Sequence, residues 1–147
     1  MLGVMSSVRL AEPGDADDIA RLLYDFNTEY EEPTPAPDVL ARRVRRLMAA
    51  DTVVLLAGGG PDGLALMRLR PSLWTDGLEC YVAELYVVPA LRGHGRGRAL
   101  IEAALELARE RGADHIELNA DEGDAAARAL YERVGFRPTA TYYERGL

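Results

Sequence analysis

The sequence predicts a single mixed α/β domain spanning residues 1–147, and three observations support this. Helical and extended patterns follow one another in the order β-α-α-β-β-β-α-β-α-β, with one further strand possible at the end. An apolar strand near the middle of the chain leads into a glycine-rich turn that opens a helix. The 147 residues, of which 48% are hydrophobic, suffice for one core and predict no second domain.

The first part of the chain predicts a short strand and two amphipathic helices. Val8 to Ala11 has an extended pattern, and Asp15 then stands where a helix N-cap is expected. Apolar residues recur at helical spacing up to about Asn27, and they do so again after a proline-rich loop. These apolar positions are Ile19, Leu22, Leu23 and Phe26 in the first helix and Leu40, Val44, Leu47 and Met48 in the second.

The middle of the chain predicts three strands. Thr52 to Ala57 and Leu64 to Leu69 flank a glycine-rich turn, which is typical of a hairpin. Tyr81 to Val88 is apolar except for Glu84, which indicates a central strand buried on both faces. Pro89 ends this strand.

The last third predicts a helix, a strand, a second helix and a final extended segment. The first helix runs from about Gly97 to Arg111, and His115 to Ala120 forms the strand. Asp124 caps the second helix, which Gly135 closes. We expect Phe136 and the residues after it to supply one or two last strands.

Composition excludes several classes of protein. The net charge of −7 disfavours nucleic-acid binding through overall charge, and the absence of lysine removes the GxxxxGK[ST] phosphate loop and Schiff-base chemistry. With Cys80 as its single cysteine, the chain forms no internal disulfide and has no zinc-binding pattern, so we expect a reduced cytoplasmic setting and no metal. Met1 to Ser7 carries no basic residue, and no run of about 18 apolar residues occurs, so neither a signal peptide nor a membrane span is expected.

Charge is unevenly distributed along the chain. Eight acids oppose a single base, Arg21, between Glu12 and Glu32, a local balance equal to the whole net charge. Arginines, in contrast, are threaded through the glycines of Arg92-Gly93-His94-Gly95-Arg96-Gly97. Unpaired backbone N–H groups and the positive end of the helix dipole converge at such a turn, which is therefore suited to phosphate.

The turn alone leaves two other interpretations open. One is an ordinary tight connection between a strand and a helix. The other is dinucleotide binding, since Gly93 and Gly95 begin a GxGxxG and Glu117 lies about 20 residues further on. Arg98 stands at the third glycine, and only about 50 residues follow the turn, both of which argue against a dinucleotide fold.

Two segments together resemble the Gcn5-related N-acetyltransferases, the GNAT superfamily. Arg92, Gly95 and Gly97 satisfy the R/Q-x-x-G-x-G/A core of the family's acetyl-CoA-binding motif. A second family pattern, A-x-x-L-Y-x-x-x-G-F, follows at the right distance. Its positions are Ala127, Leu130, Tyr131, Gly135 and Phe136.

The resemblance implies the GNAT fold, in which about four helices flank a mixed, mostly antiparallel sheet, and it implies acetyl-CoA as co-substrate. In the family, the pantetheine arm pairs with the central strand and the diphosphate rests on the turn. A backbone N–H near Val87 would face the thioester oxygen and stabilise an oxyanion. The cofactor-binding residues implied are Leu85, Tyr86, Val87, Val88, Arg92, Gly93, Gly95, Arg96, Gly97 and Arg98, with His94 at a variable position of the motif.

Two further cofactor contacts are implied near the last helix. The family often has Asn seven residues before the motif tyrosine, where this chain has Asp124. Asp serves as well as Asn as a helix N-cap. The replacement of Asn by Asp124 therefore affects the expected contact with the cofactor and not the start of the helix. Asn119, at the end of the preceding strand, is the alternative amide on this side.

The resemblance also implies the catalytic residues. Tyr131 is expected to be the general acid that protonates the leaving thiolate, and Glu84 the general base that deprotonates the acceptor amine. Glu84 is the one ionisable group in its apolar strand, where a carboxylate is costly unless it has a role or a partner. The residues themselves leave two alternatives open, a salt bridge from Glu84 to an arginine and ordinary packing of Tyr131.

The sequence therefore predicts an N-acetyltransferase that moves the acetyl group of acetyl-CoA to a primary amine by direct attack in a ternary complex. The alternative function is a non-catalytic acyl-CoA-binding sensor. Because the first two helices border the acceptor site in the family, the acidic run favours a cationic acceptor. Homodimers are frequent in the family, and the segment ending Tyr142-Tyr143-Glu144 is expected to serve as the interface, whereas no nucleic-acid or membrane partner is expected.

Overall fold

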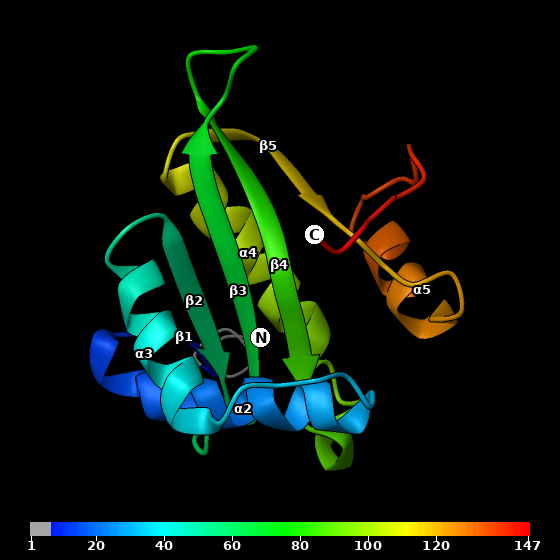
Figure 1. Ribbon diagram of the computed structural model, residues 1–147. Helices are drawn as coiled ribbons and strands as arrows, with labels where there is room; N and C mark the ends of the chain where they lie inside the picture. The colour runs from blue at the N-terminus through cyan, green and yellow to red at the C-terminus, as the bar shows by residue number, and fades with distance from the viewer. Residues whose placement is uncertain (1–6) are drawn as a thin grey trace.

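Five apolar, partly β-branched segments form one sheet in the computed structural model, which describes residues 7–147 (Figure 1). The strand order is β1-β2-β3-β4-β5, and every neighbouring pair is antiparallel except β4 and β5, which are parallel. The prediction of a mixed, mostly antiparallel sheet is therefore confirmed. The strands are β1 (Val8–Leu10), β2 (Thr52–Ala57), β3 (Gly63–Pro71), β4 (Leu78–Val87) and β5 (Ala113–Leu118).

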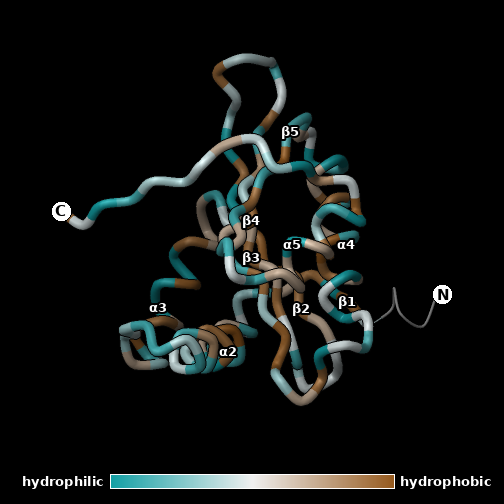
Figure 2. Tube along the Cα trace, turned by 90° about the vertical axis from the view of Figure 1, so that its right-hand side faces the viewer, coloured by the Kyte–Doolittle hydropathy of each residue, from teal (hydrophilic) through white to brown (hydrophobic). Residues whose placement is uncertain are grey.

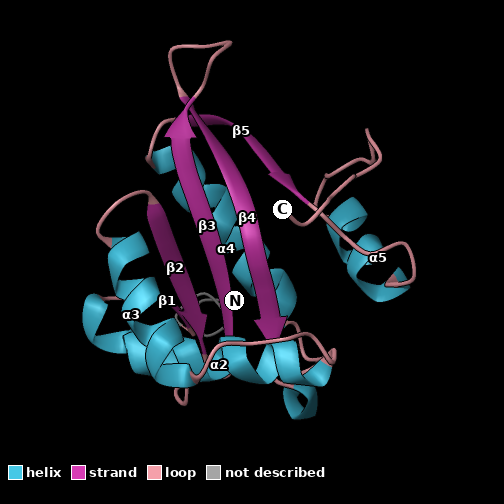
Figure 3. Cartoon of the chain, viewed as in Figure 1, coloured by secondary structure: helices cyan, strands magenta, loops and turns pink. Residues whose placement is uncertain are grey.

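Helices cover both faces of the sheet. In Figure 3, α2 and α3 lie on the viewer's side and α4 lies behind, while α5 stands beyond β5. Short 3-10 turns η1 and η2 precede α2 and follow β4. The helical elements are η1 (Pro13–Asp15), α2 (Ala16–Glu29), α3 (Pro37–Met48), η2 (Pro89–Leu91), α4 (Arg96–Glu110) and α5 (Ala125–Arg133).

The sheet divides the core into two layers. Ile19 and Leu22 of α2 pack with Val44 of α3 on one face, where Leu64 of β3 meets them. On the other face, Leu100, Ile101 and Ala104 of α4 pack against alternate residues of the same strands. The apolar spacing that predicts each helix thus coincides with the face that the helix buries.

The two predicted N-caps have different outcomes. The Asp124 carboxylate accepts the backbone N–H of Ala127 at 3.0 Å, which confirms it as the cap of α5. Asp15, however, makes no side-chain cap to α2. Its carboxylate accepts the Glu12 N–H at 2.8 Å and pairs with Arg9, so it closes the preceding 3-10 turn instead.

The expected final strands do not form, so this part of the predicted element order is wrong. Residues 134–147 have no regular structure, and Figure 2 shows the C-terminal segment projecting away from the sheet. Only Val134 and Phe136 of this segment pack against the core. A strand needs a neighbour for its backbone groups, and Pro138 lacks one of the donors that such pairing uses.

The prediction that Met1 to Ser7 is not a signal peptide concerns residues of which 1–6 lie outside the described part of the chain. Within residues 7–147, no helix is both long and apolar enough to cross a membrane.

Candidate active site

The fourth strand contains a β-bulge that decides where its side chains point. The β3–β4 register passes from Met67 opposite Val82 to Leu66 opposite Glu84, so Ala83 is an extra residue in β4. Cross-strand partners share a face of the sheet, and Leu66 lies in the core under α2 and α3. The bulge therefore turns Glu84 toward the α2/α3 face. In a regular strand it would share the face of Val82, under α4.

Beyond the bulge, one edge of β4 has no strand beside it. Pairing between β4 and β5 covers Leu78 to Val82 and ends at the pair Val82 and Leu118. Residues 84–87 therefore keep their β3 partners but have no β5 partner, and the bulge residue Ala83 is paired with neither strand. The backbone N–H and C=O groups on this edge are available to an extended ligand that pairs like a strand.

The glycine-rich turn follows this free edge and opens α4. Gly93 and Gly95 have φ angles of 80° and 85°, which glycine adopts at no steric cost. Gly95 is the N-cap of α4, and no side chain caps the helix, so the first N–H groups of α4 point out of its end. A Cβ atom built on either glycine would meet nothing within 4 Å, so the space over the turn is open. This openness fits a bound diphosphate better than a merely tight connection.

The three arginines of the turn each face a carboxylate. Arg96 lies 3.9 Å from Asp62, and Arg98 lies 3.2 Å from Glu102 one helical turn away. Both contacts are single and partly exposed, which leaves most of each guanidinium free for another anion.

Arg92 is held much more firmly than the other two. Its two terminal nitrogens donate to the two carboxylate oxygens of Glu29 at 2.7 and 2.8 Å, and its Nε donates to the Val87 carbonyl at 2.9 Å. The Tyr86 hydroxyl also donates to Glu29, and the Arg92 guanidinium lies 5.5 Å from the Tyr86 ring. The pair lowers the pKa of Glu29 and raises that of Arg92 through these hydrogen bonds. The Arg92 side chain therefore ties the turn to the end of α2.

Glu84 is a half-buried carboxylate without a compensating partner. Among residues 7–147 it takes part in no hydrogen bond and no ion pair, so the salt bridge to an arginine is not formed. Burial raises the pKa of Glu84 above its usual value of 4.5. A carboxylate that is partly buried, unpaired and raised in pKa has properties expected of a general base.

Tyr131 lies on α5, which stands beyond β5 in Figure 3. Its ring makes an edge-to-face contact with Phe136, with the ring centroids 6.1 Å apart. Burial, helped by the charge of Asp124, raises the pKa of Tyr131 to about 12. The phenol thus stays protonated at neutral pH and retains a proton to give.

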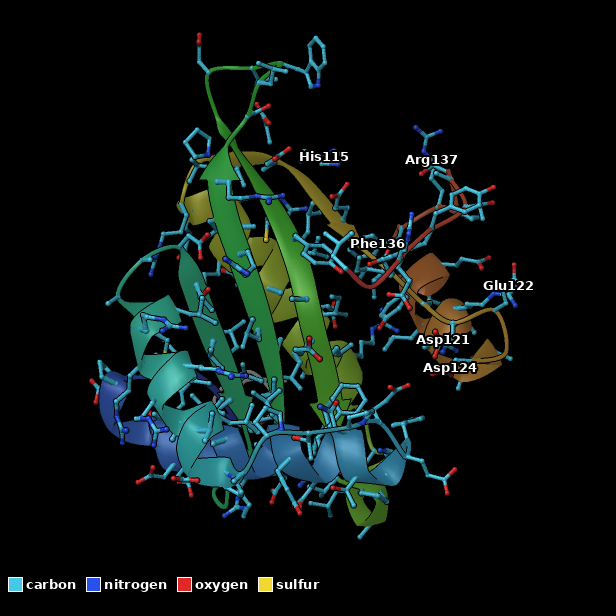
Figure 4. The ribbon with its side chains drawn as sticks, viewed as in Figure 1. His115, Asp121, Glu122, Asp124, Phe136 and Arg137 are labelled. Carbon is cyan, nitrogen blue, oxygen red and sulfur yellow. The ribbon has the colours of Figure 1, made fainter. Side chains whose placement is uncertain are left out.

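The amides and carboxylates expected near the thioester have partners within the protein. Asn119 donates its side-chain N–H to the Tyr81 hydroxyl at 2.8 Å, and Asp124 caps α5, whose start Figure 4 marks. The His94 ring contacts the Arg92 carbonyl at 2.9 Å. Side chains of Leu85 and Val87 point to the α4 layer, and those of Tyr86 and Val88 to the α2 layer. The backbone N–H and C=O of Val88 are bonded to Asp62 and Leu91, and the Val87 carbonyl accepts from Arg92, so the backbone open to a ligand is chiefly that of Leu85 and Tyr86.

Comparison with known proteins decides the family. The profile of the Acetyltransferase (GNAT) family matches residues 17–136. The chain belongs to this family. The GNAT match runs from α2 to Phe136 and includes the glycine turn and the bulged fourth strand.

Individual GNAT relatives agree with this classification. A solved structure of an acetyltransferase from Arthrobacter sp. FB24 is 46% identical, superposes with a TM-score of 0.86, and covers 95% of both chains. The mycothiol acetyltransferase of Beutenbergia cavernae is 40% identical over 82 residues, which are 54% of this chain but 28% of that protein. An N-acetyltransferase of Bacillus subtilis is 28% identical over 88% of this chain and 89% of its own. The chain thus spans less than a third of the mycothiol enzyme.

Two residues that contact predicted residues of this candidate site were not predicted from the sequence. Glu29 is one of eight acids in a run, and its contact with Arg92 joins positions 63 residues apart. Tyr81 begins an apolar strand, where its ring alone suggests packing. The acidic run indicated that this region carries functional charge, but it did not single out Glu29. Nothing in the sequence distinguished Tyr81 from a core residue.

Proposed function

We propose that this chain transfers the acetyl group of acetyl-CoA to a primary amine by direct attack in a ternary complex, with Glu84 as general base and Tyr131 as general acid. The β4 bulge carries the proposal. It sets an uncompensated carboxylate beside a free strand edge that ends at an open, phosphate-suited turn. A sensor that only bound the co-substrate would have no use for that carboxylate.

Binding of acetyl-CoA requires groups for its amides and its diphosphate. The free backbone edge at residues 83–87 suits the amides, because it offers both donors and acceptors in a strand-like spacing. The N–H groups at the start of α4 suit the diphosphate, with Arg96 and Arg98 adding charge. When bound, acetyl-CoA supplies the thioester that is the acetyl donor.

Proton transfer is assigned to Glu84 and Tyr131, both of which have raised pKa values. Glu84, once ionised, takes a proton from the acceptor ammonium, which leaves an amine with a lone pair for the carbonyl carbon. As the new C–N bond forms and the C–S bond breaks, Tyr131 gives its proton to the departing sulfur. The base lies on the α2/α3 face of β4 and the acid on α5, so the two groups come from different elements of the fold.

We propose a cationic acceptor because of the acidic run from Glu12 to Glu32. Arginines of the protein already neutralise part of this run. Four of the eight acids pair with arginines, as Asp15, Asp17, Asp18 and Glu29 do. Asp25, Glu31 and Glu32 keep exposed carboxylates near the end of α2. These three are the groups we expect to attract a cationic amine.

An acetyl-transfer assay tests the proposed function. The purified chain is incubated with acetyl-CoA and a panel of amines, and the released CoA thiol is measured. We expect Tyr131→Phe to slow turnover far more than it weakens acetyl-CoA binding, and Glu84→Gln to shift activity to higher pH, where the amine loses its proton unaided. Tyr143→Phe and Glu106→Gln, the same changes at exposed positions, serve as controls.

The alternatives predict different results in the same experiments. Binding of acetyl-CoA without turnover on any amine would favour the sensor. An increase in melting temperature with NAD but not with acetyl-CoA would favour dinucleotide binding. Normal activity in both Tyr131→Phe and Glu84→Gln would overturn the catalytic assignments.

We also propose that the chain acts in the cytoplasm.

A homodimer joined through the C-terminal segment is proposed as well. Tyr143 is 89% exposed, and β5 is the last strand of the sheet, so its outer edge has no neighbour among the described residues. A segment added to that edge would pair backbone groups and cover exposed rings. Light scattering of the full chain and of a chain ending at Pro138 tests this. A monomer in both cases contradicts it.

A further inference from the structure

Tyr81 and Asn119 meet at the point where β4 and β5 separate. The last paired residues of the two strands are Val82 and Leu118, and Tyr81 and Asn119 flank this pair. The Asn119 side-chain nitrogen donates to the Tyr81 hydroxyl oxygen at 2.8 Å. Because that oxygen already accepts a hydrogen bond, the orientation of the phenol is fixed and its own O–H proton is left for a different acceptor.

The bulge brings this phenol and Glu84 to one face. Cys80 and Val82 both lie in the α4 layer, so Tyr81 between them points to the α2/α3 side. Glu84 points to the same side only because Ala83 is inserted. Two polar groups that regular alternation would place on opposite faces therefore share the acceptor side of the sheet.

The surroundings keep the phenol neutral. Burial raises the pKa of Tyr81, and negative charge on Glu84 of β4, Glu117 of β5 and Tyr142 of the C-terminal segment raises it further. The Glu84 carboxylate thus lies within electrostatic reach of the Tyr81 hydroxyl. Tyr81 is therefore a hydrogen-bond donor at neutral pH.

We propose that Tyr81, oriented by Asn119, positions the water through which Glu84 deprotonates the acceptor ammonium. This role rests on the proposed function. The water accepts a proton from the ammonium as the N–H bond breaks, and it gives one of its own protons to the Glu84 carboxylate. Tyr81 donates its hydrogen bond to the second lone pair of that water and keeps its proton throughout, so it is a positioning residue.

Three variants test the role of Tyr81. Tyr81→Phe removes the hydroxyl and keeps the ring. Asn119→Asp keeps the size of the side chain but replaces the donor with an acceptor, which draws the Tyr81 O–H toward residue 119 and away from the water. Tyr143→Phe removes a hydroxyl from an exposed ring and is the matched control.

We expect Tyr81→Phe and Asn119→Asp each to lower kcat by about 10- to 100-fold, while the KM for acetyl-CoA changes by less than about threefold. The double variant should be no slower than the slower single variant, because both changes remove the same hydrogen bond. A merely structural role would instead give losses that add and a lower melting temperature. The acceptor used is the amine of the panel that wild type acetylates fastest.

Several outcomes overturn the proposal. If Tyr81→Phe retains the kcat of Tyr143→Phe, the hydroxyl has no role in the reaction. If Asn119→Asp raises the KM for acetyl-CoA and leaves kcat unchanged, Asn119 holds the co-substrate and does not orient Tyr81. If wild type itself turns over no amine, the proposed function fails first, and this result is distinct from a loss confined to the variants.

Discussion

The Glu29–Arg92 pair predicts a measurable link between the end of α2 and the turn at the start of α4. Replacing Glu29 with Gln keeps the shape of the side chain and removes its charge. Replacing Arg92 with Met keeps most of the apolar stem and removes the guanidinium. The two single variants and the double variant form a thermodynamic cycle that isolates the interaction between the two side chains.

The structure sets the magnitude of this interaction. Exposed ion pairs contribute about 0.2–1 kcal/mol, whereas hydrogen bonds to charged groups contribute about 1.5–3 kcal/mol. This pair has two short, parallel hydrogen bonds, but the Arg92 and Glu29 side chains keep 39% and 28% of their surface exposed. We therefore expect a coupling free energy of about 1–2 kcal/mol, or a decrease of about 3–6 °C in melting temperature for each single variant.

Urea denaturation measures the coupling, and its pH dependence provides an independent check. The folded protein lowers the pKa of Glu29 below its usual 4.5, so the pair stabilises the fold fully above that pH. This contribution is lost as the pH falls through the lowered pKa. The difference in free energy of unfolding between wild type and Glu29→Gln should therefore become smaller at acidic pH.

Acetyl-CoA binding distinguishes the two possible roles of Arg92. If the pair holds the turn in place, Glu29→Gln and Arg92→Met weaken binding to a similar degree. If Arg92 contacts the diphosphate directly, only Arg92→Met weakens it strongly. A coupling free energy below about 0.5 kcal/mol, or a stability difference that does not change with pH, would refute the reasoning from the structure.

Three further predictions concern stability and reactivity. A Cβ atom on Gly63 would lie 2.8 Å from the Tyr86 carbonyl oxygen, so Gly63→Ala should destabilise the protein by about 1–3 kcal/mol in urea, whereas Gly59→Ala, with nothing within 4 Å, should not. Asp124→Ala removes the cap of α5 and should cost about 1 kcal/mol by the same measurement; an effect no larger than that of Asp121→Ala would contradict the capping role. Burial raises the pKa of the Cys80 thiol to about 11, and the residue is 1% exposed, so iodoacetamide should label it only in denaturant. Rapid labelling of the native protein would show that β4 opens.

Most of the fold was predictable because helical and strand spacing coincide with burial. Thr52 to Ala57 was predicted with the bounds that β2 has, and the predicted helices differ from α3 and α4 by few residues. The final strands were predicted from local pattern, but a strand depends on a neighbour that no local pattern supplies. The same limit explains why Glu29 was not identified, since its partner lies 63 residues away.

The candidate site was predictable where it is contiguous in sequence and not where it depends on register. The turn from Arg92 to Gly97 carries its chemistry in consecutive residues. The bulge at Ala83 lies in a strand that is apolar on both faces, so the sequence contains no alternation whose phase would reveal one inserted residue. The placement of Tyr81 and Glu84 on one face of the sheet could not be predicted for this reason.

One inserted residue in β4 accounts for two properties that the proposed reaction needs together. The inserted Ala83 follows directly on Val82, the last residue of β4 that pairs with β5, so the bulge lies where backbone groups become available to an extended co-substrate. It also reverses the direction of Glu84, which would otherwise lie among the apolar side chains under α4, where a carboxylate has no access to an amine. Because the change of register turns Glu84 at the start of the free edge, the base lies next to the backbone groups that we propose bind the co-substrate. The bulge is therefore better understood as the element that sets the geometry of the site than as a local irregularity of the sheet.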